Sequence, residues 1–186
     1  MAAATFLFLA IEFLRVTTIP PLGPQVHRAL LRYLDPRDTC GPIIVSHTYL
    51  LIGISIPMYL CNSPAGIICL GLGDAAASVF GRIYGKHRWS LPRGNKKSVE
   101  GTLCFVVAAV TGLCLYKYAV LKTLYPSVYY GPAYVLDSYN PFVKAGSLTF
   151  SKMVLVSTLT ALLEAFSSLN DNVIVPLYMT ALVQLC

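Results

Sequence analysis

Six apolar stretches constrain the fold of this chain more than any other feature. A helix needs roughly 20 apolar residues to cross a hydrocarbon core of about 30 Å. Six segments approach that length, separated by breakers rich in Pro, Gly and Asn. They are residues 2–18, 43–60, 65–81, 103–122, 148–166 and 172–186. We therefore predict an all-α fold: a polytopic transmembrane helical bundle of about six membrane segments, forming a single domain over residues 1–186.

The overall composition supports a membrane protein. Apolar residues make up 56% of the chain and charged residues 12%, whereas soluble domains carry about 25% charged residues. The first stretch lacks the basic region of a signal peptide and contains Glu12 and Arg15, so we expect it to remain as a membrane helix. The six cysteines show no C-x-x-C spacing, which indicates neither a zinc site nor a disulfide framework.

The distribution of positive charge predicts the orientation. A net charge of +6 would suggest a nucleic-acid partner in a soluble protein. Here most basic residues lie in the loops 19–42 and 82–102, and short cytoplasmic loops carry the excess of Lys and Arg. We therefore expect both loops to face the cytosol, with membrane lipids around the chain and no nucleic acid bound.

Asp74 stands inside the third apolar stretch. A charged side chain in a membrane segment costs at least about 2.5 kcal/mol, which makes it a candidate functional residue. The alternative is a structural ion pair with a neighbouring arginine. The small residues around Asp74 allow another backbone, a ligand or a metal to come close. These residues are Gly71, Gly73, Ala75, Ala76, Ala77 and Ser78.

The loop 82–102 has the composition of a phosphate-binding cradle. Its basic side chains suit phosphate oxygens, and its glycines allow close backbone approach. A polybasic patch on anionic lipid is the alternative, although Ser98, Glu100 and Thr102 are unusual for that purpose. The spacing of Ala77, Gly81 and Gly85 fits helix packing equally well. Two nucleotide motifs fail: "GLGDAA" has no strand before it, and "GRIYGKH" is one residue short of a P-loop.

Two further acids are expected at the same membrane face. Glu164 and Asp171 are seven residues apart at the cytosolic end of the fifth stretch, so we expect them on roughly one helical face. Together with Asp74 they are the predicted catalytic acids.

The segments "GDAAASVFGRIYGKHRW", "KKSVEGT" and "EAFSSLNDNVIVPL" resemble the dolichol kinase family of CTP-dependent polyprenol kinases. The resemblance covers roughly residues 11–181. It implies transfer of the γ-phosphoryl group of CTP to dolichol, giving dolichyl phosphate and CDP for protein N-glycosylation. It also implies a multi-pass protein of the endoplasmic reticulum membrane with a cytosolic active site. Members of the family are longer, so the chain resembles their C-terminal catalytic portion, as a compact homologue, a shortened form or a fragment.

The resemblance also assigns roles to residues. Asp74 becomes a metal ligand or the base that activates the hydroxyl, and Asp171 and Asn172 complete the shell of a divalent cation, expected to be Mg²⁺. Arg82, Lys96 and Lys97 receive the triphosphate. The full expected nucleotide-binding set is Gly73, Ser78, Gly81, Arg82, Gly85, Lys86, Lys96, Lys97, Ser98, Glu100, Gly101 and Thr102.

Other functions remain open at this point. A CTP:phosphatidate cytidylyltransferase shares the "KK-(S/T)-x-EG" block but ends in a Gly-, His- and Asp-rich signature that is absent here. Phytol, farnesol or diacylglycerol are alternative acceptors. A non-catalytic membrane subunit or a transporter is the alternative of another class, although a conduction path should place charges at several depths. The sequence also leaves a homo-oligomer open.

Overall fold

The computed structural model describes residues 2–31, 45–89, 97–124, 145–167 and 170–186. Its secondary structure is helical, apart from one isolated bridge between Arg88 and Ser98 among the described residues. The chain divides into two compact units, Met1–Ile52 and Gly53–Cys186. The all-α prediction is confirmed for the described residues, while the single domain over residues 1–186 stays a prediction.

The first unit contains α1 (Ala2–Thr17) and α2 (Gly23–Leu31), which pack against each other. α1 matches the first predicted stretch, and its buried Glu12 and Arg15 form an ion pair of 2.6 Å. The prediction of a loop over residues 19–42 missed a helix, because α2 lies within that segment. α2 mixes apolar with polar residues, so a search for continuous apolar stretches does not detect it.

The second unit carries the candidate site. α3 (Val45–Cys61) enters it from the first unit at Gly53. The other elements are α4 (Ala65–Ile68), η1 (Cys69–Asp74), α5 (Ala75–Tyr84), α6 (Val99–Leu115), η2 (Tyr116–Leu121), α7 (Lys122–Leu124), α11 (Phe150–Phe166) and α12 (Asp171–Leu185).

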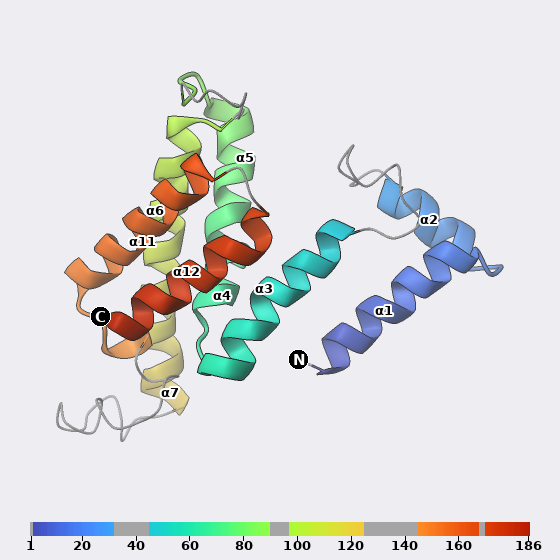
Figure 1. Ribbon diagram of the computed structural model, residues 1–186, viewed down its shortest axis with the longest axis horizontal. Helices are drawn as coiled ribbons and strands as arrows, with labels where there is room; N and C mark the ends of the chain where they lie inside the picture. The colour runs from blue at the N-terminus through green and yellow to red at the C-terminus, as the bar shows by residue number, and fades with distance from the viewer. Residues whose placement is uncertain (1, 32–44, 90–96, 125–144, 168–169) are drawn as a thin grey trace. The chain divides into compact units, whose positions relative to one another are not determined.

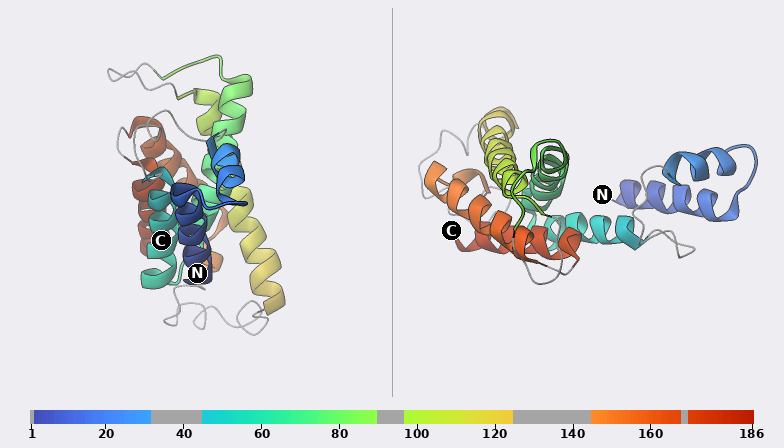
Figure 2. Two further views of the ribbon diagram at one scale, coloured as in Figure 1. Left: turned by 90° about the vertical axis from the view of Figure 1, so that its right-hand side faces the viewer. Right: turned by 90° about the horizontal axis from the view of Figure 1, so that it is seen from above.

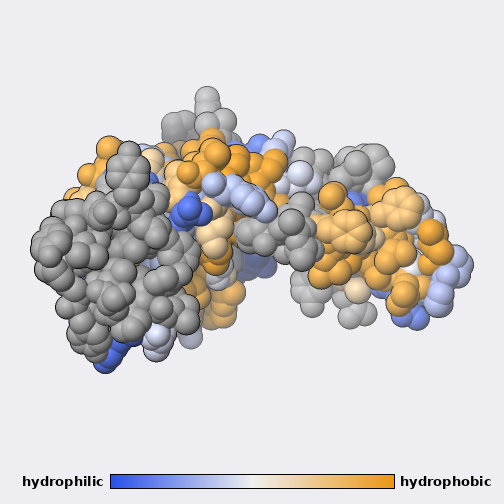
Figure 3. Space-filling model, turned by 90° about the horizontal axis from the view of Figure 1, so that it is seen from below, coloured by the Kyte–Doolittle hydropathy of each residue, from blue (hydrophilic) through white to orange (hydrophobic). Residues whose placement is uncertain are grey.

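Among the described residues, two helices of this unit are long and apolar enough to cross a membrane. They span Ala65–Tyr84 and Val99–Ala119. Large apolar side chains on their outer faces are exposed, for example Ile83 at 64% and Val107 at 66%. Apolar residues also make up much of the surface that is not grey in Figure 3. Such surfaces are typical of lipid-facing helices. The other four predicted stretches correspond to shorter helices, so the number of about six spans and their bundle arrangement stay predictions.

α6 lies at the centre of the second unit. It packs against α5 and α11, while α12 packs against α11 and α4 (Figures 1 and 2). Phe105, Ala109 and Leu113 recur every four residues along the buried face of α6. They pack in one core cluster with apolar residues of α11 and α12. Lys97, just before α6, contacts the last turn of α11 and the first residue of α12, so these three helix termini lie close together.

A π-helical segment interrupts the first of the long helices. η1 (Cys69–Asp74) lies between α4 and α5 and ends on Asp74. π-helical turns inside α-helices are rare and occur frequently at functional sites. They insert an extra residue per turn, which rotates all following side chains about the helix axis. The segment therefore helps to set the direction in which Asp74 points.

Gly53 allows a close contact between α3 and α12. A Cβ atom on Gly53 would lie 1.8 Å from the backbone oxygen of Asn172. That oxygen lies four residues before Pro176, which has no N–H to donate to it.

We expect Gly53→Ala to lower stability by at least about 1–3 kcal/mol, the usual cost of overpacking. Thermal unfolding of the purified protein in detergent measures this effect. Gly71→Ala is the matched control, because a Cβ on Gly71 would have no atom within 4 Å. Equal melting temperatures for the two variants would contradict the contact.

Candidate functional site

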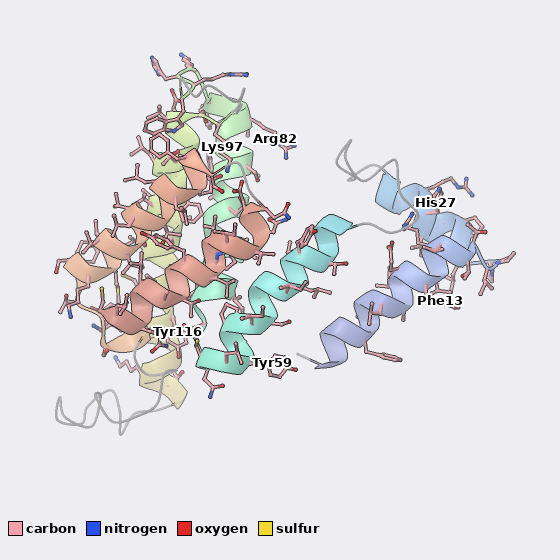
Figure 4. All side chains as sticks on the ribbon, in the orientation of Figure 1. Phe13, His27, Tyr59, Arg82, Lys97 and Tyr116 are labelled. Atoms are coloured by element: carbon pink, nitrogen blue, oxygen red, sulfur yellow. The ribbon has the colours of Figure 1, made fainter. Side chains whose placement is uncertain are left out.

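Lys97 is the centre of an ion cluster at the end of the second unit where α5 ends and α6 begins (Figure 4). Its Nζ lies 2.6 Å from Oε1 of Glu164 and 2.5 Å from Oδ2 of Asp171. Nζ also donates a hydrogen bond of 2.5 Å to the backbone oxygen of Glu164. The three donor positions of one ammonium group are thereby used. Lys97 thus joins the segment before α6 to the end of α11 and the start of α12.

The cluster keeps Lys97 charged. Burial alone lowers the pKa of this lysine, but the charge of Glu164 and the hydrogen bonds to Asp171 and Glu164 outweigh burial. The pKa of Lys97 therefore lies above its ordinary value. Lys97 remains a cation at any pH at which the protein would work.

Asp74 belongs to the same electrostatic cluster. Its carboxylate lies close enough to interact with the charges of Lys97 and Asp171, and Glu164 also interacts with the charge of Asp74. Asp74 is the N-cap residue of α5 but makes no capping hydrogen bond with its side chain. Its carboxylate is therefore not used to hold the helix and is available for a ligand or a proton.

The structure brings the three predicted catalytic acids together, but not in the way the sequence suggested. Glu164 and Asp171 do not share a helical face. α11 ends at Phe166, Ser167 is extended, and Asp171 is the first residue of α12. An acid in the first turn of a helix interacts favourably with the helix dipole. The two carboxylates meet because both bind Lys97.

The donor set of the cluster suits a hard divalent cation. Two carboxylates contact the ammonium group of Lys97, the carboxylate of Asp74 interacts with the same charges, and Oδ1 of Asp171 is buried with no hydrogen-bond partner among the described atoms. Among the described residues no three His, Cys, Asp or Glu side chains form a compact ligand set by themselves. Mg²⁺ is usually bound by one or two carboxylates together with substrate phosphates. The residues present therefore fit a cation that arrives with a phosphorylated ligand.

The predicted loop 82–102 is shorter than expected, and its described ends pair through an antiparallel bridge between Arg88 and Ser98 that forms the base of a small hairpin. Arg82 is still on α5, while Glu100, Gly101 and Thr102 form the first turn of α6. Glu100 accepts hydrogen bonds from the backbone N–H of His87, at 3.1 and 3.3 Å, and contacts the Nδ1 atom of His87 at 2.7 Å. Glu100 therefore fastens the start of the loop to α6.

Ser98 and the glycines near it bring α5 and α6 close together. Ser98 caps α6 by accepting a hydrogen bond of 3.1 Å from the backbone N–H of Gly101. A Cβ on Gly85 would lie 2.8 Å from the side chain of Ser98, and one on Gly101 would lie 3.0 Å from the backbone oxygen of Ala77. The packing interpretation of this glycine spacing is supported. A role of these residues in nucleotide binding stays a prediction.

The other predicted nucleotide-binding residues are dispersed. Arg82 and Lys86 are exposed and free to approach a ligand from water. Ser78 donates a hydrogen bond to the backbone oxygen of Ala75. The ring of Phe105 packs where a Cβ of Gly73 would lie. A Cβ on Gly81 would lie 3.0 Å from the Ser98 hydroxyl. Lys96 lies outside the described residues.

Two residues near the site, Trp89 and Phe166, were not singled out from the sequence. Trp89 contacts both Thr102 and Phe166. Trp89 is the only tryptophan in the chain and directly follows the basic run "GKHR", which was the available signal.

Comparison with known proteins identifies homologues over nearly the whole chain. The chain is 38% identical to the dolichol kinase of Saccharomyces cerevisiae over 172 residues, covering 92% of this chain and 29% of that protein. It is 37% identical to dolichol kinase sec59 of Schizosaccharomyces pombe, covering 96% of this chain and 32% of that protein. It is 32% identical to the human dolichol kinase, with 96% and 31% covered.

These relatives are longer than the present chain. The chain spans about a third of the length of the curated relatives it matches. No family model matches the sequence, and no solved structure matches the fold. The chain is homologous to dolichol kinases over nearly its whole length, which confirms the family resemblance that its motifs indicate.

Proposed function

We propose that this chain is the catalytic portion of a dolichol kinase, which transfers the γ-phosphoryl group of CTP to the terminal hydroxyl of dolichol. The products are dolichyl phosphate and CDP. The named activity of its relatives supports this assignment. We further propose that the protein lies in the endoplasmic reticulum membrane with this site facing the cytosol, which the distribution of Lys and Arg supports.

One observation carries the proposal: Lys97 binds two acids beside apolar helices, and the charge of Asp74 interacts with the same cluster. Asp74 comes from a helix long enough to cross a membrane, and Lys97 precedes the start of another. A lipid alcohol must bring its hydroxyl group to the membrane surface, whereas a nucleotide arrives from water. Only the boundary between the two phases allows both substrates to reach the same carboxylate.

The proposed roles follow from where the side chains lie. Asp74 accepts the proton of the dolichol hydroxyl as its oxygen attacks the γ-phosphorus. The bond between the γ-phosphorus and the bridging oxygen breaks, and its electron pair leaves with CDP. The exposed Arg82 and Lys86 bind phosphate oxygens. Lys97 holds Glu164 and Asp171 in position rather than reaching for the nucleotide.

A divalent cation fits the same residues. Asp74 and Asp171, with Asn172 next to Asp171 in α12, would hold it together with the phosphates. When bound, it would neutralise charge on the triphosphate. We propose Mg²⁺ as this cation, because the available ligands are carboxylate, amide and phosphate oxygens.

The transfer assay tests the proposal. Purified protein is incubated with dolichol, Mg²⁺ and CTP labelled in the γ-phosphate, and we expect labelled dolichyl phosphate with CDP in equal amount. A cytidylyltransferase would instead form pyrophosphate when phosphatidate is supplied. Phosphorylation of phytol, farnesol or diacylglycerol in preference to dolichol would show that this other alcohol is the acceptor. Absence of all these products, from protein that remains folded, would overturn the enzyme assignment.

A further inference from the structure

The backbone around Trp89 closes the base of the loop between α5 and α6. The N–H of Trp89 donates to the backbone oxygen of Lys97 at 3.1 Å. The N–H of Val99 donates to the backbone oxygen of His87 at 2.9 Å, with an antiparallel bridge between Arg88 and Ser98. Trp89 and Lys97 are therefore paired across a short hairpin. A displacement of one is transmitted to the other through the backbone.

The side chain of Trp89 contacts two helices. Its indole N–H donates a hydrogen bond of 3.1 Å to Oγ1 of Thr102, in the first turn of α6. Its ring lies against Phe166, the last residue of α11, with ring centroids 5.1 Å apart and planes inclined by 57°. Tilted pairs at this separation are favourable aromatic contacts. The indole therefore makes a polar contact with Thr102 and an apolar contact with Phe166 at the same time.

The two partners across the hairpin contact the same end of α11. Lys97 binds Glu164, and Trp89 packs on Phe166, two residues further along. Glu164 in turn belongs to the cluster that includes Asp74 and Asp171. Movement of Trp89 relative to Phe166 would therefore move Lys97 relative to the acids it holds.

We propose that Trp89 is a positioning residue that fixes the hairpin on α11 and thereby keeps Lys97 on Glu164 and Asp171. Its catalytic consequence rests on the proposed kinase function. The simpler alternative is that Trp89 is an ordinary tryptophan at the membrane surface, where aromatic residues are common. An interfacial tryptophan would not depend on Thr102 or Phe166, and the two explanations therefore predict different results.

A spectroscopic test examines the contacts independently of activity. Trp89 is the only tryptophan, so intrinsic emission reports its surroundings alone. We expect Thr102→Val and Phe166→Leu to shift this emission to longer wavelength, because the indole becomes more exposed to water. Thr111→Val is the matched control for the first, since Thr111 likewise bonds a backbone oxygen four residues earlier on α6. Phe80→Leu is the control for the second, as an aromatic residue whose ring stacks on Tyr84.

A kinetic test examines positioning. Trp89→Phe keeps a ring for Phe166 but removes the indole N–H, so we expect kcat to fall about 2- to 10-fold, the effect of one hydrogen bond. Trp89→Ala should reduce kcat about 100-fold, as expected when catalytic groups are misplaced by about 1 Å. The double variant Trp89→Phe with Thr102→Val should be no slower than the slower of the two single variants, because both changes remove the same bond.

The outcomes separate the two proposals. Unchanged emission in both Thr102→Val and Phe166→Leu would show that the contacts are not formed, whatever the activity. Shifted emission with unchanged kcat in every Trp89 variant would overturn the positioning role. Shifted emission in these two variants, when the wild-type protein forms no dolichyl phosphate, would leave the contacts standing and would overturn the proposed kinase function instead.

Discussion

Replacement of Asp74 by asparagine is expected to reduce the kcat for dolichyl phosphate formation by at least about 100-fold, the lower end for loss of a positioned acid–base group. Asparagine has nearly the same size but cannot accept the hydroxyl proton. The side chain of Asp74 makes no capping bond, and its charge is attracted by Lys97 but repelled by Asp171 and Glu164. The change should therefore leave stability unaltered or slightly increased, which the thermal unfolding midpoint will show.

Two further measurements identify the role of Asp74. Asp74→Glu keeps the charge on a longer side chain, so we expect partial activity, because phosphoryl transfer depends mainly on positioning. If Asp74 acts only by holding the cation, excess Mg²⁺ should restore much of the rate of Asp74→Asn. If it accepts the proton, excess Mg²⁺ should not restore it. Wild-type turnover by Asp74→Asn would remove this residue from the mechanism.

The positions of the helices were largely predictable because apolar length is a direct physical requirement. The stretch 148–166 corresponds to α11 (Phe150–Phe166), and the stretch 43–60 corresponds to α3 (Val45–Cys61). A helix that contacts lipid or a packed core on most of its surface must be apolar all round. α2 has polar residues on part of its surface, so the same reasoning missed it.

The grouping of the acids was predicted for an incorrect reason. Counting seven residues from Glu164 to Asp171 assumes one continuous helix, but the chain leaves the helix after Phe166. The pairing of both acids with Lys97 is a tertiary contact over 67 and 74 residues of sequence. No local pattern contains such information. The π-helical turn before Asp74 is equally invisible, because its residues would also suit an α-helix.

The glycines near the site illustrate the same limit. A glycine predicts that something approaches closely, but not what approaches. At Gly85 the neighbour is Ser98, and at Gly73 it is the ring of Phe105. A phosphate group and another helix require the same absence of a side chain. Only the structure shows that a helix or a side chain from the protein itself fills these places.

Substitution of Lys97 by methionine is expected to be the most destabilising single change at the site. Methionine has a similar length and no charge, so Glu164 and Asp171 would lose their shared cation. Removing one partner of a buried ion pair costs about 3–5 kcal/mol, because the remaining charges are left uncompensated. Glu164 is 7% exposed and has little access to water that could replace the lysine. We expect a lower unfolding midpoint and loss of activity together.

The exposed Lys122→Met is the matched control, and its unfolding midpoint should not change. Lys97→Arg should recover only part of the stability, because a planar guanidinium group does not reproduce three contacts made by one nitrogen atom. The double variant Lys97→Met with Glu164→Gln should be more stable than Lys97→Met alone, since the second change removes an uncompensated charge.

These variants distinguish the two roles available to Lys97. A lysine that only bound the triphosphate would, when replaced, raise the KM for CTP without changing the unfolding midpoint, since the phosphate is its sole partner. A lysine that holds the acids must lower the midpoint in the absence of nucleotide, and Glu164→Gln must then restore part of that loss. Because these results are mutually exclusive, an unchanged midpoint for Lys97→Met would show that the ion cluster does not support the fold.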